Sequence, residues 1–347
     1  MKKIFFTMVA IAAIAACTKS EVQYEQSTEI GLAPVTYKAT KAAESDNIYN
    51  QDLPMYVFAN TYADETPTMF DQPYFQNALF THRTNGEFGG DEARYYWPNV
   101  KTLVFAGLSK SGNVNNGATP KYEMNVYNEG ATKTLEIELE GYAPGYGGDN
   151  EGDNDLMWFP TTAAYSKQEA AIGVTMKHAC AWVTIKISGD ETTGVEPTET
   201  AKPWNILDVK FEDLSQLGNV VLGNNADWTD VAEGTEFPVY AAGTGNGKEL
   251  TTGLVDYTKK AVNNTYTDLV VVPQSTKTLY IKYKYTSDPK NGITFTETKA
   301  IPLNYNGNKG WEAGYHYTYN ITIGTEEILV KPDVKTWETP ADTNIEF

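Results

Sequence analysis

The chain has 347 residues, among them 27 Lys and Arg against 45 Asp and Glu, and its formal net charge is −18 at pH 7. A negative charge of this size repels phosphate groups, so the composition argues against a nucleic-acid partner and against electrostatic attraction to anionic lipids. The length exceeds what one hydrophobic core ordinarily fills, which predicts two domains.

The first residues are typical of a secretion signal. Lys2 and Lys3 precede an apolar stretch, residues 4–16, that is too short to span a membrane. Cys17 follows small residues, a pattern typical of lipoproteins whose cysteine thiol is acylated during export. We therefore expect residues 1–16 to be a lipoprotein signal peptide and Cys17 to hold the chain at the cell outer membrane through several acyl chains. The alternative is an ordinary signal peptide with a coincidental cysteine.

Strand patterns dominate the rest of the chain. Apolar and polar residues alternate clearly over residues 135–140, 181–188, 279–285 and 316–323. Alternation with a period of two indicates strands that have one buried and one solvent-facing side, as in antiparallel sandwiches rather than parallel sheets. The sequence therefore predicts an all-β fold of two tandem antiparallel β-sandwich domains.

A few local signals add to this pattern. Residues 74–82 could form one short helix, with Asp71 as its cap. Gly89 and Gly90 are predicted to lie in a turn between strands. His316 lies on the polar side of its predicted strand, so we expect its side chain to be exposed to solvent.

Catalytic motifs are absent from the sequence, which contains no His-Glu-x-x-His, P-loop or nucleophile-elbow pattern. A hydrolase, which is a third functional hypothesis, would need a histidine beside a nucleophile and an acid, and His82, His178 and His316 are far apart in the sequence. We expect no enzymatic activity, no cofactor and no metal site. Cys180 lies in an apolar stretch and is expected to be a buried small hydrophobe rather than a reactive thiol.

Two features allow a bound ligand to be considered. An oxygen-rich loop can bind Ca²⁺, and acidic residues here recur at every second position: Asp149, Glu151, Asp153 and Asp155. Their order does not match an EF-hand, so a solvated acidic loop is the preferred interpretation. Exposed aromatic residues can also stack on sugars, although packing in cores is their commoner use. Clustering on one exposed face would favour sugar binding for Trp204, Trp228 and Trp311.

Several short strings occur in order along the chain: Glu29 to Pro34 with Lys38 to Ala42, Arg94 to Pro98 with Leu103 to Ala106, Asp155 to Trp158, Met176 to Ala179, Val271 to Gln274, and Trp311 to Gly314 with Tyr317 to Ile321. Together they resemble the fimbrillin family, the subunits of type V pili and related lipoproteins. Each string is weak by itself, but their order and their spread over nearly the whole mature chain make the combined resemblance specific.

The resemblance implies sandwiches of transthyretin-like type, export as a lipoprotein, and removal of a leader segment by a surface protease. Removal of the leader would open a groove that a strand from a neighbouring subunit fills. With a linker pattern near residues 165–170, the expected division is a signal peptide at 1–16, a lipid tether and leader strand at 17–41, an N-terminal β-sandwich at 42–166, and a C-terminal β-sandwich with a tail strand at 167–347.

The processing site departs from the family pattern. Members are commonly cut after an arginine near the start of the first domain, whereas the first arginine here is Arg83, well inside that domain. Lys38 and Lys41 occupy the expected zone and are the candidate processing sites. The alternative is that this chain is not processed and serves as an anchor or as a stand-alone lipoprotein.

The C-terminal tail contains a candidate donor strand. Ile328, Val330 and Val334 share one parity, with Pro332 between them. Burial of three such side chains would contribute roughly 5–9 kcal/mol before the cost of ordering the strand. The alternative is that this tail closes its own domain as an edge strand.

The main functional hypothesis is a surface-exposed fimbrillin-like lipoprotein, either a structural subunit or an adhesin of type V pili assembled by strand exchange. Its expected partners are other pilus subunits or copies of itself, with a host or bacterial surface glycan or protein as a further candidate. The alternative hypothesis is a glycan-binding surface lipoprotein of a nutrient-uptake system.

Overall fold

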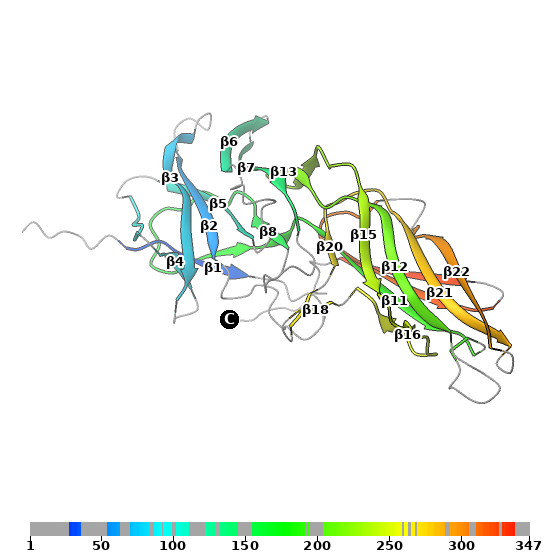
Figure 1. The fold of residues 1–347 in the computed structure, drawn as a ribbon. Coiled ribbons are helices and arrows are strands. Elements are labelled where there is room, and N and C mark those ends of the chain that lie inside the picture. Colours follow the sequence, from blue (N-terminus) through cyan, green and yellow to red (C-terminus); the bar gives the residue numbers. More distant parts are fainter. Residues whose placement is uncertain are drawn as a thin grey trace, which may run out of the picture.

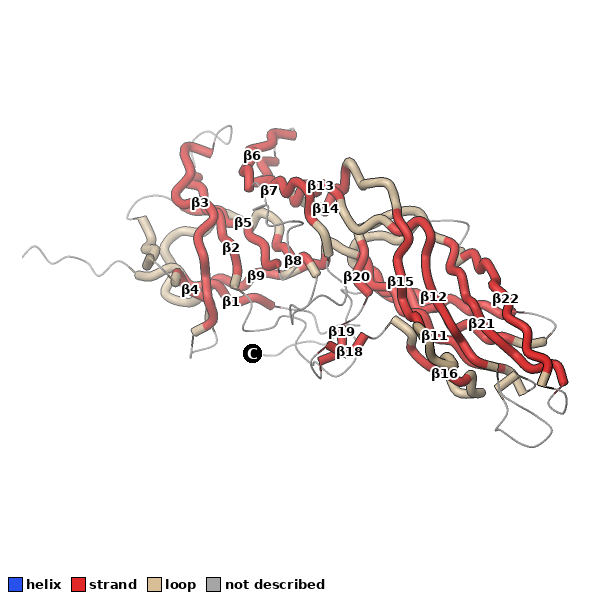
Figure 2. The backbone as a smooth tube through the Cα atoms, viewed as in Figure 1, coloured by secondary structure: helices blue, strands red, loops and turns tan. Residues whose placement is uncertain are grey.

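The computed structural model describes residues 28–35, 54–62, 70–83, 87–91, 93–98, 102–110, 122–129, 132–144, 155–191, 193–194, 204–258, 260–262, 265–267, 269–288, 292–304, 310–325 and 328–336. All regular elements in these ranges are strands (Figure 2), so the predicted all-β class is confirmed. Within the same ranges, no helix with the length and apolar character of a membrane span occurs. The strands lie along an elongated molecule (Figure 1).

The first sheet has eight strands, in the spatial order β10-β8-β5-β2-β3-β4-β1-β9. Their bounds are β1 (Gly31–Val35), β2 (Met55–Tyr62), β3 (Phe70–His82), β4 (Phe88–Gly90), β5 (Thr102–Lys110), β8 (Leu156–Phe159), β9 (Ile172–Thr175) and β10 (Lys177–His178). The two edge strands, β9 and β10, belong to one continuous stretch with only Met176 between them. The sheet therefore curls until both of its edges meet at this stretch.

The curled sheet surrounds a hydrophobic cluster that we call the N-terminal core. Its buried residues are Ile30, Leu32, Met55, Val57, Ala59, Phe75, Ala78, Phe80, Phe88, Trp97, Leu103, Phe105, Met157, Phe159, Ile172, Val174 and Met176. Several of them come from alternate positions along one strand, because successive side chains of a strand point to opposite faces. The remaining positions of β2, β5 and β8 face outwards from this cluster, onto a second one.

A four-stranded sheet covers that outer face. It has the order β14-β13-β7-β6 and consists of β6 (Tyr122–Glu129), β7 (Thr132–Tyr142), β13 (Gly218–Leu222) and β14 (Ala226–Thr229). Leu135, Ile137 and Leu139 of β7 are completely buried, as their alternation predicts. They belong to a cluster that we call the shared core, which also contains Phe58, Val104, Ala106, Leu108, Tyr142, Leu156, Trp158, Ala179, Cys180, Trp182, Val220, Leu222 and Val270.

This four-stranded sheet joins distant parts of the chain. Its strands β6 and β7 precede β8, whereas the β13–β14 hairpin follows β12, and Val220 lies opposite Leu139. The predicted domain boundary between residues 166 and 167 falls between β8 and β9 and stays a prediction. The β13–β14 hairpin nevertheless extends a sheet that the earlier part of the chain begins.

The C-terminal part is a sandwich of two five-stranded sheets. One contains β11 (Ala181–Gly189), β17 (Val255–Asp256), β20 (Leu269–Val271), β23 (Tyr315–Ile323) and β24 (Ile328–Thr336). The other contains β12 (Asn205–Leu214), β15 (Thr235–Ala241), β16 (Lys248–Glu249), β21 (Thr278–Asp288) and β22 (Ile293–Pro302). A small hairpin of β18 (Lys260–Val262) and β19 (Thr265–Thr267) stands apart from both sheets.

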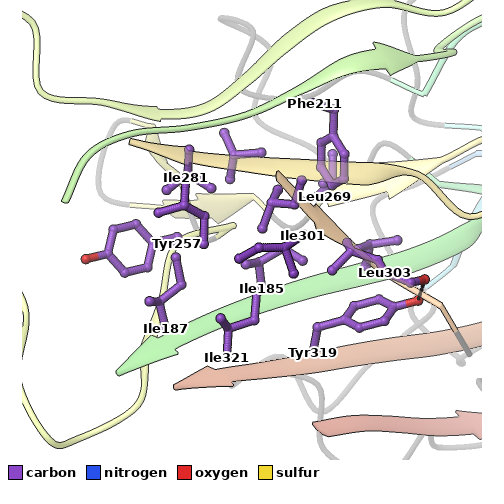
Figure 3. Close-up of a cluster of buried hydrophobic side chains, with 14 of the residues drawn as sticks. Ile185, Ile187, Phe211, Tyr257, Leu269, Ile281, Ile301, Leu303, Tyr319 and Ile321 are labelled. Carbon is purple, nitrogen blue, oxygen red and sulfur yellow. Dashed lines mark hydrogen bonds between the residues drawn. The ribbon is translucent and has the colours of Figure 1, made fainter. Parts of the chain in front are cut away.

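Between these two sheets lies the C-terminal core (Figure 3). Its buried residues include Ile185, Ile187, Phe211, Tyr257, Leu269, Ile281, Ile301, Leu303, Tyr319 and Ile321. The Tyr319 hydroxyl, which would be costly to bury without a partner, donates to the Leu303 carbonyl oxygen at 3.1 Å and accepts a hydrogen bond from Trp311 Nε1 at 2.9 Å. The alternations over residues 279–285 and 316–323 predict which side chains are buried. Those side chains belong to this core: Leu279, Ile281, Tyr283, Tyr317, Tyr319, Ile321 and Ile323.

Strand β11 differs from its predicted one-sided burial. Ala181, Val183, Ile185 and Ile187 face the C-terminal core, but Trp182 on the other side belongs to the shared core and is only 5% exposed. β11 therefore has apolar packing on both faces. Such a strand is typical of parallel pairing, and β11 does pair in parallel with β23. The pairings within the described residues are antiparallel except for β11–β23 and β1–β9. The transthyretin-like detail stays a prediction.

The predicted helix at residues 74–82 is wrong, because this segment is part of β3. Phe75, Ala78 and Phe80 are buried in the N-terminal core, and pairing with β2 satisfies the backbone. The uneven spacing of these apolar residues comes from irregularities in the β2–β3 register, where Asn77 has a positive φ of 51°. A strand irregularity of this kind resembles helical spacing in the sequence.

Candidate assembly site

The predicted leader strand corresponds to β1, which lies inside the first sheet. β1 runs antiparallel to β4 and parallel to β9, so that Leu32 lies opposite Phe88 on one side and Ile172 on the other. Ile30 and Leu32 are completely buried in the N-terminal core. Burying two such side chains contributes roughly 3–6 kcal/mol before ordering costs. We call residues 28–35 the leader segment.

Backbone hydrogen bonds hold the start of the leader segment against residues 95–97. The Ile30 amide donates to the Tyr95 carbonyl oxygen at 2.8 Å, and the Trp97 amide donates to the Thr28 carbonyl oxygen at 3.0 Å. Trp97 itself is buried in the N-terminal core, so these bonds attach the leader segment to a fixed part of the fold.

An ion pair adds to these backbone bonds. Arg83 Nη2 donates to Glu29 Oε1 and also to the Gly90 carbonyl oxygen at 3.1 Å. Arg94 Nη1 lies 3.8 Å from Glu29 Oε2. The hydrogen bond from Arg83 is the main reason that the pKa of the Glu29 carboxyl is lowered, with smaller contributions from the charges of Arg83 and Arg94, against the opposing effect of burial. We call Arg83 with Gly90 and Arg94 the carboxylate clamp.

Two glycines of β4 lie where a side chain would clash, and one of them, Gly89, makes room for the clamp. A Cβ atom added to Gly89 would lie 2.3 Å from Arg83 Cζ, and one added to Gly90 would lie 2.0 Å from the Ala93 carbonyl oxygen. The guanidinium group therefore lies close above Gly89, where only glycine leaves space. The sequence predicts a turn at Gly89 and Gly90, and this is wrong: both residues belong to β4, and Gly89 lies opposite Gly31 of the leader strand. Glycine is needed at these two positions because a larger side chain would clash there, and not because the backbone turns.

The candidate donor strand corresponds to β24. It pairs antiparallel with β23 along its whole length, from Ile323 opposite Ile328 to Tyr315 opposite Thr336. Within the described residues it is the edge strand of its sheet. Ile328, Val330 and Val334 are half-buried against the C-terminal core, as their shared parity predicts. The structure thus contains the alternative arrangement, in which the tail closes its own domain, and the donor role stays a prediction.

The other predicted site residues are distributed as follows. Cys17, Lys38 and Lys41 lie outside the described residues, as do Asp149, Glu151 and Asp153 of the acidic loop. Asp155 is not part of a solvated loop, because its Oδ2 contacts His178 Nδ1 and the two side chains are 8% and 4% exposed. No cluster of three or more metal-ligating side chains occurs among the residues that the structure describes.

Cys180 is buried in the shared core, as predicted, and burial raises the pKa of its thiol well above the usual value. The exposure predicted for His316 is wrong. Its ring stacks on Trp182 of the neighbouring strand β11, with ring centroids 3.6 Å apart. Burial, with smaller contributions from Lys186 and Lys335, lowers the pKa of His316 to about 4. Parity along β23 indicated the side of the sheet correctly, but it carried no information about the shared core that covers this side.

The three tryptophans considered for sugar stacking are not gathered on one exposed face. Trp311 is 1% exposed in the C-terminal core, and Trp228 packs against the shared core with its Nε1 donating to the Ala179 carbonyl oxygen at 2.7 Å. Trp204 instead begins a row of aromatic rings on the sheet that contains β21 and β22. It stacks on Tyr285 at 4.6 Å, and Tyr285 stacks on Phe295 at 5.6 Å.

Sequence reasoning missed the carboxylate clamp. Glu29 and Arg83 are 54 residues apart, and no local pattern connects them. In the sequence, Arg83 is notable only as the first arginine, which lies too far inside the first domain to be the processing site. The structure gives this residue a different role, since it holds the leader segment at Glu29.

The fold resembles those of several solved proteins. A fimbrial protein from Bacteroides vulgatus is 16% identical with a TM-score of 0.58, and the match covers 89% of this chain and 99% of that one. Proposed cell adhesion proteins from Bacteroides uniformis (16% identical; 89% and 99% covered) and Bacteroides ovatus (12% identical; 91% and 99% covered) both have TM-scores of 0.50. A search of curated proteins found no match.

A family model described as fimbrillin-like matches residues 39–337, which is most of the chain. The match contains both the β4–Arg83 region and β24, and it begins just after the leader segment. Together with the strand patterns and the ordered strings of the sequence, this match shows that the chain belongs to the fimbrillin-like family.

Proposed function

We propose that this chain is a surface-exposed, lipid-anchored structural subunit or adhesin of type V pili, and that it assembles by strand exchange. The observation that carries the proposal is the position of the leader segment. It supplies two fully buried side chains to the N-terminal core, yet its only covalent link to the rest of the first domain is the chain between Val35 and β2. One cut in that connection, at Lys38 or Lys41, would leave the leader segment held by non-covalent contacts alone.

Loss of the leader segment would expose both the backbone and the core. β1 pairs with β4 on one side and β9 on the other, so its departure would leave unpaired edges on both strands. The places of Ile30 and Leu32 would become an apolar slot beside them. An incoming strand with alternating apolar residues repairs both defects at once, because backbone pairing supplies affinity and the slot supplies specificity.

β24 is suited to be that incoming strand. Ile328, Val330 and Val334 are only half-buried where they now lie, whereas the places of Ile30 and Leu32 are completely buried. A transfer from an edge position to a closed slot therefore buries additional apolar surface, at about 25 cal/mol per Å². The same transfer exchanges one set of backbone hydrogen bonds for another.

The cellular location is part of the proposal. Cys17 would carry the lipid anchor in the outer membrane, and the related structures are named as fimbrial and cell adhesion proteins. The partners are then other pilus subunits or further copies of this chain. No catalytic step is required, since the proposed interaction uses backbone edges and apolar side chains.

The test uses the full mature chain with a site for a sequence-specific protease inserted between Lys38 and Lys41. After cleavage and incubation, we expect oligomers that resist SDS without heating, whereas the uncleaved chain stays monomeric. Val330→Asp, which places a charge in the transferred face, should remove the oligomers. Leu329→Asp on the exposed face of the same strand is the matched control and should leave them intact. A cleaved chain that has lost its leader segment and still stays monomeric would refute assembly by strand exchange.

A second candidate function is glycan binding, and the aromatic row favours it. Phe295 is 47% exposed, and Tyr285 beneath it donates a hydrogen bond to Glu297 Oε1 at 2.9 Å. Rings of this kind can stack on the apolar face of a sugar, beside a carboxylate that accepts hydrogen bonds. A glycan array probed with the wild-type chain and with Phe295→Ser tests it. A hit that the substitution abolishes supports glycan binding, and a blank array refutes it.

A further inference from the structure

Strand β22 is an edge strand of the C-terminal sandwich. Within the described residues it pairs only with β21, and it lies at the outer side of the sheet that also contains β12 and β15 (Figure 1). Both faces of β22 are exposed from Ile293 to Ala300, apart from the half-buried Glu297. Ile293 is 51% exposed and Phe295 is 47% exposed. β22 therefore presents backbone groups and apolar side chains to a further strand.

Two other edge strands of this sandwich are interrupted, whereas β22 is regular. β15 contains Pro238, and its register against β12 shifts twice. β24 contains Pro332 near its centre. In β22 the one proline is the last residue, Pro302, and the register with β21 is unbroken from Pro302 to Thr294. Prolines and bulges normally prevent pairing between edges, and the exposed part of β22 contains neither.

The side chains of β22 are complementary to those of a second β22 that runs antiparallel to it. One face of the strand carries Ile293, Phe295, Glu297, Lys299 and Ile301 in this order, so that an acidic and a basic residue lie between apolar ones. If Thr298 lies opposite Thr298 of the second copy, the opposed residues are Glu297 with Lys299, Thr296 with Ala300, Phe295 with Ile301, and Thr294 with Pro302. Each charge then meets the opposite charge, and Phe295 meets an apolar side chain.

The same two charges exclude the neighbouring registers. Sliding one strand by two residues places Glu297 opposite Glu297 in one direction and Lys299 opposite Lys299 in the other. Like charges directly opposite each other destabilise a strand pair. A slip of one residue would turn the exposed apolar side chains to the wrong face. The register about Thr298 is therefore favoured over those next to it.

Hydrogen bonds hold the central carboxylate in place. Tyr285 donates to Glu297 Oε1 at 2.9 Å and Tyr283 donates to Glu297 Oε2 at 3.2 Å. These bonds, chiefly the one from Tyr285, lower the pKa of Glu297, so that its carboxylate is charged at neutral pH. Lys299 Nζ lies 3.5 Å from Glu297 Oε2, and the two side chains are 51% and 40% exposed. Both charges can therefore be reached by a second copy.

We propose that β22 pairs with β22 of a second copy of this chain, antiparallel about Thr298, and so joins the two sheets into one. The pairing involves neither the leader segment nor β24, so it goes beyond the strand exchange proposed above and supplies a different contact between copies. One pair of edge strands is a small interface, and we therefore expect a reversible dimer. Such a dimer separates in SDS, unlike the oligomers that strand exchange would form.

A charge test uses the full mature chain with its leader segment uncut, and with Cys17→Ser so that acyl chains make no contribution. Sedimentation equilibrium of this chain should show monomers and dimers. Glu297→Lys and Lys299→Glu each oppose like charges and should weaken the dimer at least ~10-fold. A mixture of these two variants opposes unlike charges and should associate to within about threefold of the parent chain. Lys282→Glu, at an exposed position of β21, is the matched control and should change little.

Cysteine cross-linking tests the register. Opposed residues of antiparallel strands have Cα atoms about 4.5–5.5 Å apart, which is within the range of a disulfide. Thr298→Cys should therefore form a disulfide-linked dimer with oxidised glutathione. Thr296→Cys on the same face would lie opposite Ala300 and should stay monomeric in non-reducing SDS gels. The native Cys180 is buried, so it should not contribute.

The outcomes separate this inference from the proposed function. A parent chain that stays monomeric up to ~0.5 mM, or a mixture of the two charge variants that does not associate, refutes the pairing of β22 while strand exchange stands. Cross-linking through Thr296→Cys as efficient as through Thr298→Cys refutes the register. Circular dichroism and the melting temperature of each variant confirm that it is folded before its association is compared.

Discussion

Trp182 and His316 stack face to face on the neighbouring parallel strands β11 and β23, with ring centroids 3.6 Å apart and planes 5° from parallel. His316 Nε2 also lies 2.9 Å from Thr184 Oγ1. This contact lies where the sandwich meets the shared core, since Trp182 packs into that core from the same strand whose other face lines the C-terminal core. A protonated imidazole there would carry a charge at a buried position, with two lysines, Lys186 and Lys335, nearby.

His316 should make the stability of the protein depend on pH. Burial is the largest cause of its lowered pKa, Lys186 and Lys335 lower it further, and Asp333 opposes them. Because the folded pKa of about 4 lies below the unfolded value, stability is fully present above about pH 6.5 and is lost as the pH falls towards 4. We expect a loss of about 3 kcal/mol over this range, measured by urea unfolding at a series of pH values. His316→Gln should flatten the profile, and an unchanged slope in this variant would contradict the assignment.

The leader segment should contribute strongly to the stability of the uncut chain. Leu32→Ala removes a completely buried side chain from the N-terminal core and should lower the free energy of unfolding by about 2–5 kcal/mol. Leu329→Ala, at an exposed position of β24, is the matched control and should change it by less than about 0.5 kcal/mol. Equal effects of the two substitutions in urea unfolding would show that β1 does not pack as described.

Arg83 should hold the leader segment more strongly than Arg94 does. Arg83→Gln removes the hydrogen bonds to Glu29 and Gly90 and should lower stability by up to about 1 kcal/mol, while speeding amide exchange over residues 28–35. Arg94→Gln should have little effect, because this side chain is 71% exposed and lies 3.8 Å from Glu29. Hydrogen exchange read by mass spectrometry distinguishes the two, and faster exchange in the Arg94 variant would reverse the assignment.

The clamp should also weaken in acid. The pKa of Glu29 is lowered in the folded chain, chiefly by its hydrogen bond with Arg83, so its contribution is present above the unfolded pKa of about 4.5. It is lost as the pH falls below that value, and amide exchange of the leader segment should rise there. In Glu29→Gln this acid-induced rise should be absent, and its persistence would assign the effect to another group.

The Tyr319 hydroxyl should be important for the C-terminal core. Tyr319→Phe leaves Trp311 Nε1 and the Leu303 carbonyl oxygen buried without this partner, which should cost about 1–3 kcal/mol in the free energy of unfolding. Tyr285→Phe removes a hydroxyl that donates to the partly exposed Glu297 and should have a much smaller effect. Thermal and urea unfolding of the two variants test this difference. Equal losses in the free energy of unfolding would contradict the role given to Tyr319.

The candidate site could be predicted only in part. The apolar parity of Ile328, Val330 and Val334 was visible in the sequence and corresponds to the half-buried face of β24. The pairing of Glu29 with Arg83 was not visible, because it depends on β1 lying beside β4 and on Gly89 leaving room for a guanidinium group. Such a contact joins residues that only the folded chain brings together.

The sequence by itself determined the strand class and the inward-facing side of strands such as β7, β21 and β23, because alternation with a period of two is a local property of the backbone. Only the tertiary structure decided which distant strands pair, as β1 does with β4 and β9, and β13 does with β7. It also decided that β11 is covered on both faces and that residues 74–82 form a strand rather than a helix. Pairing and coverage depend on hydrogen-bond partners and apolar surfaces supplied by remote segments, and no local pattern records them.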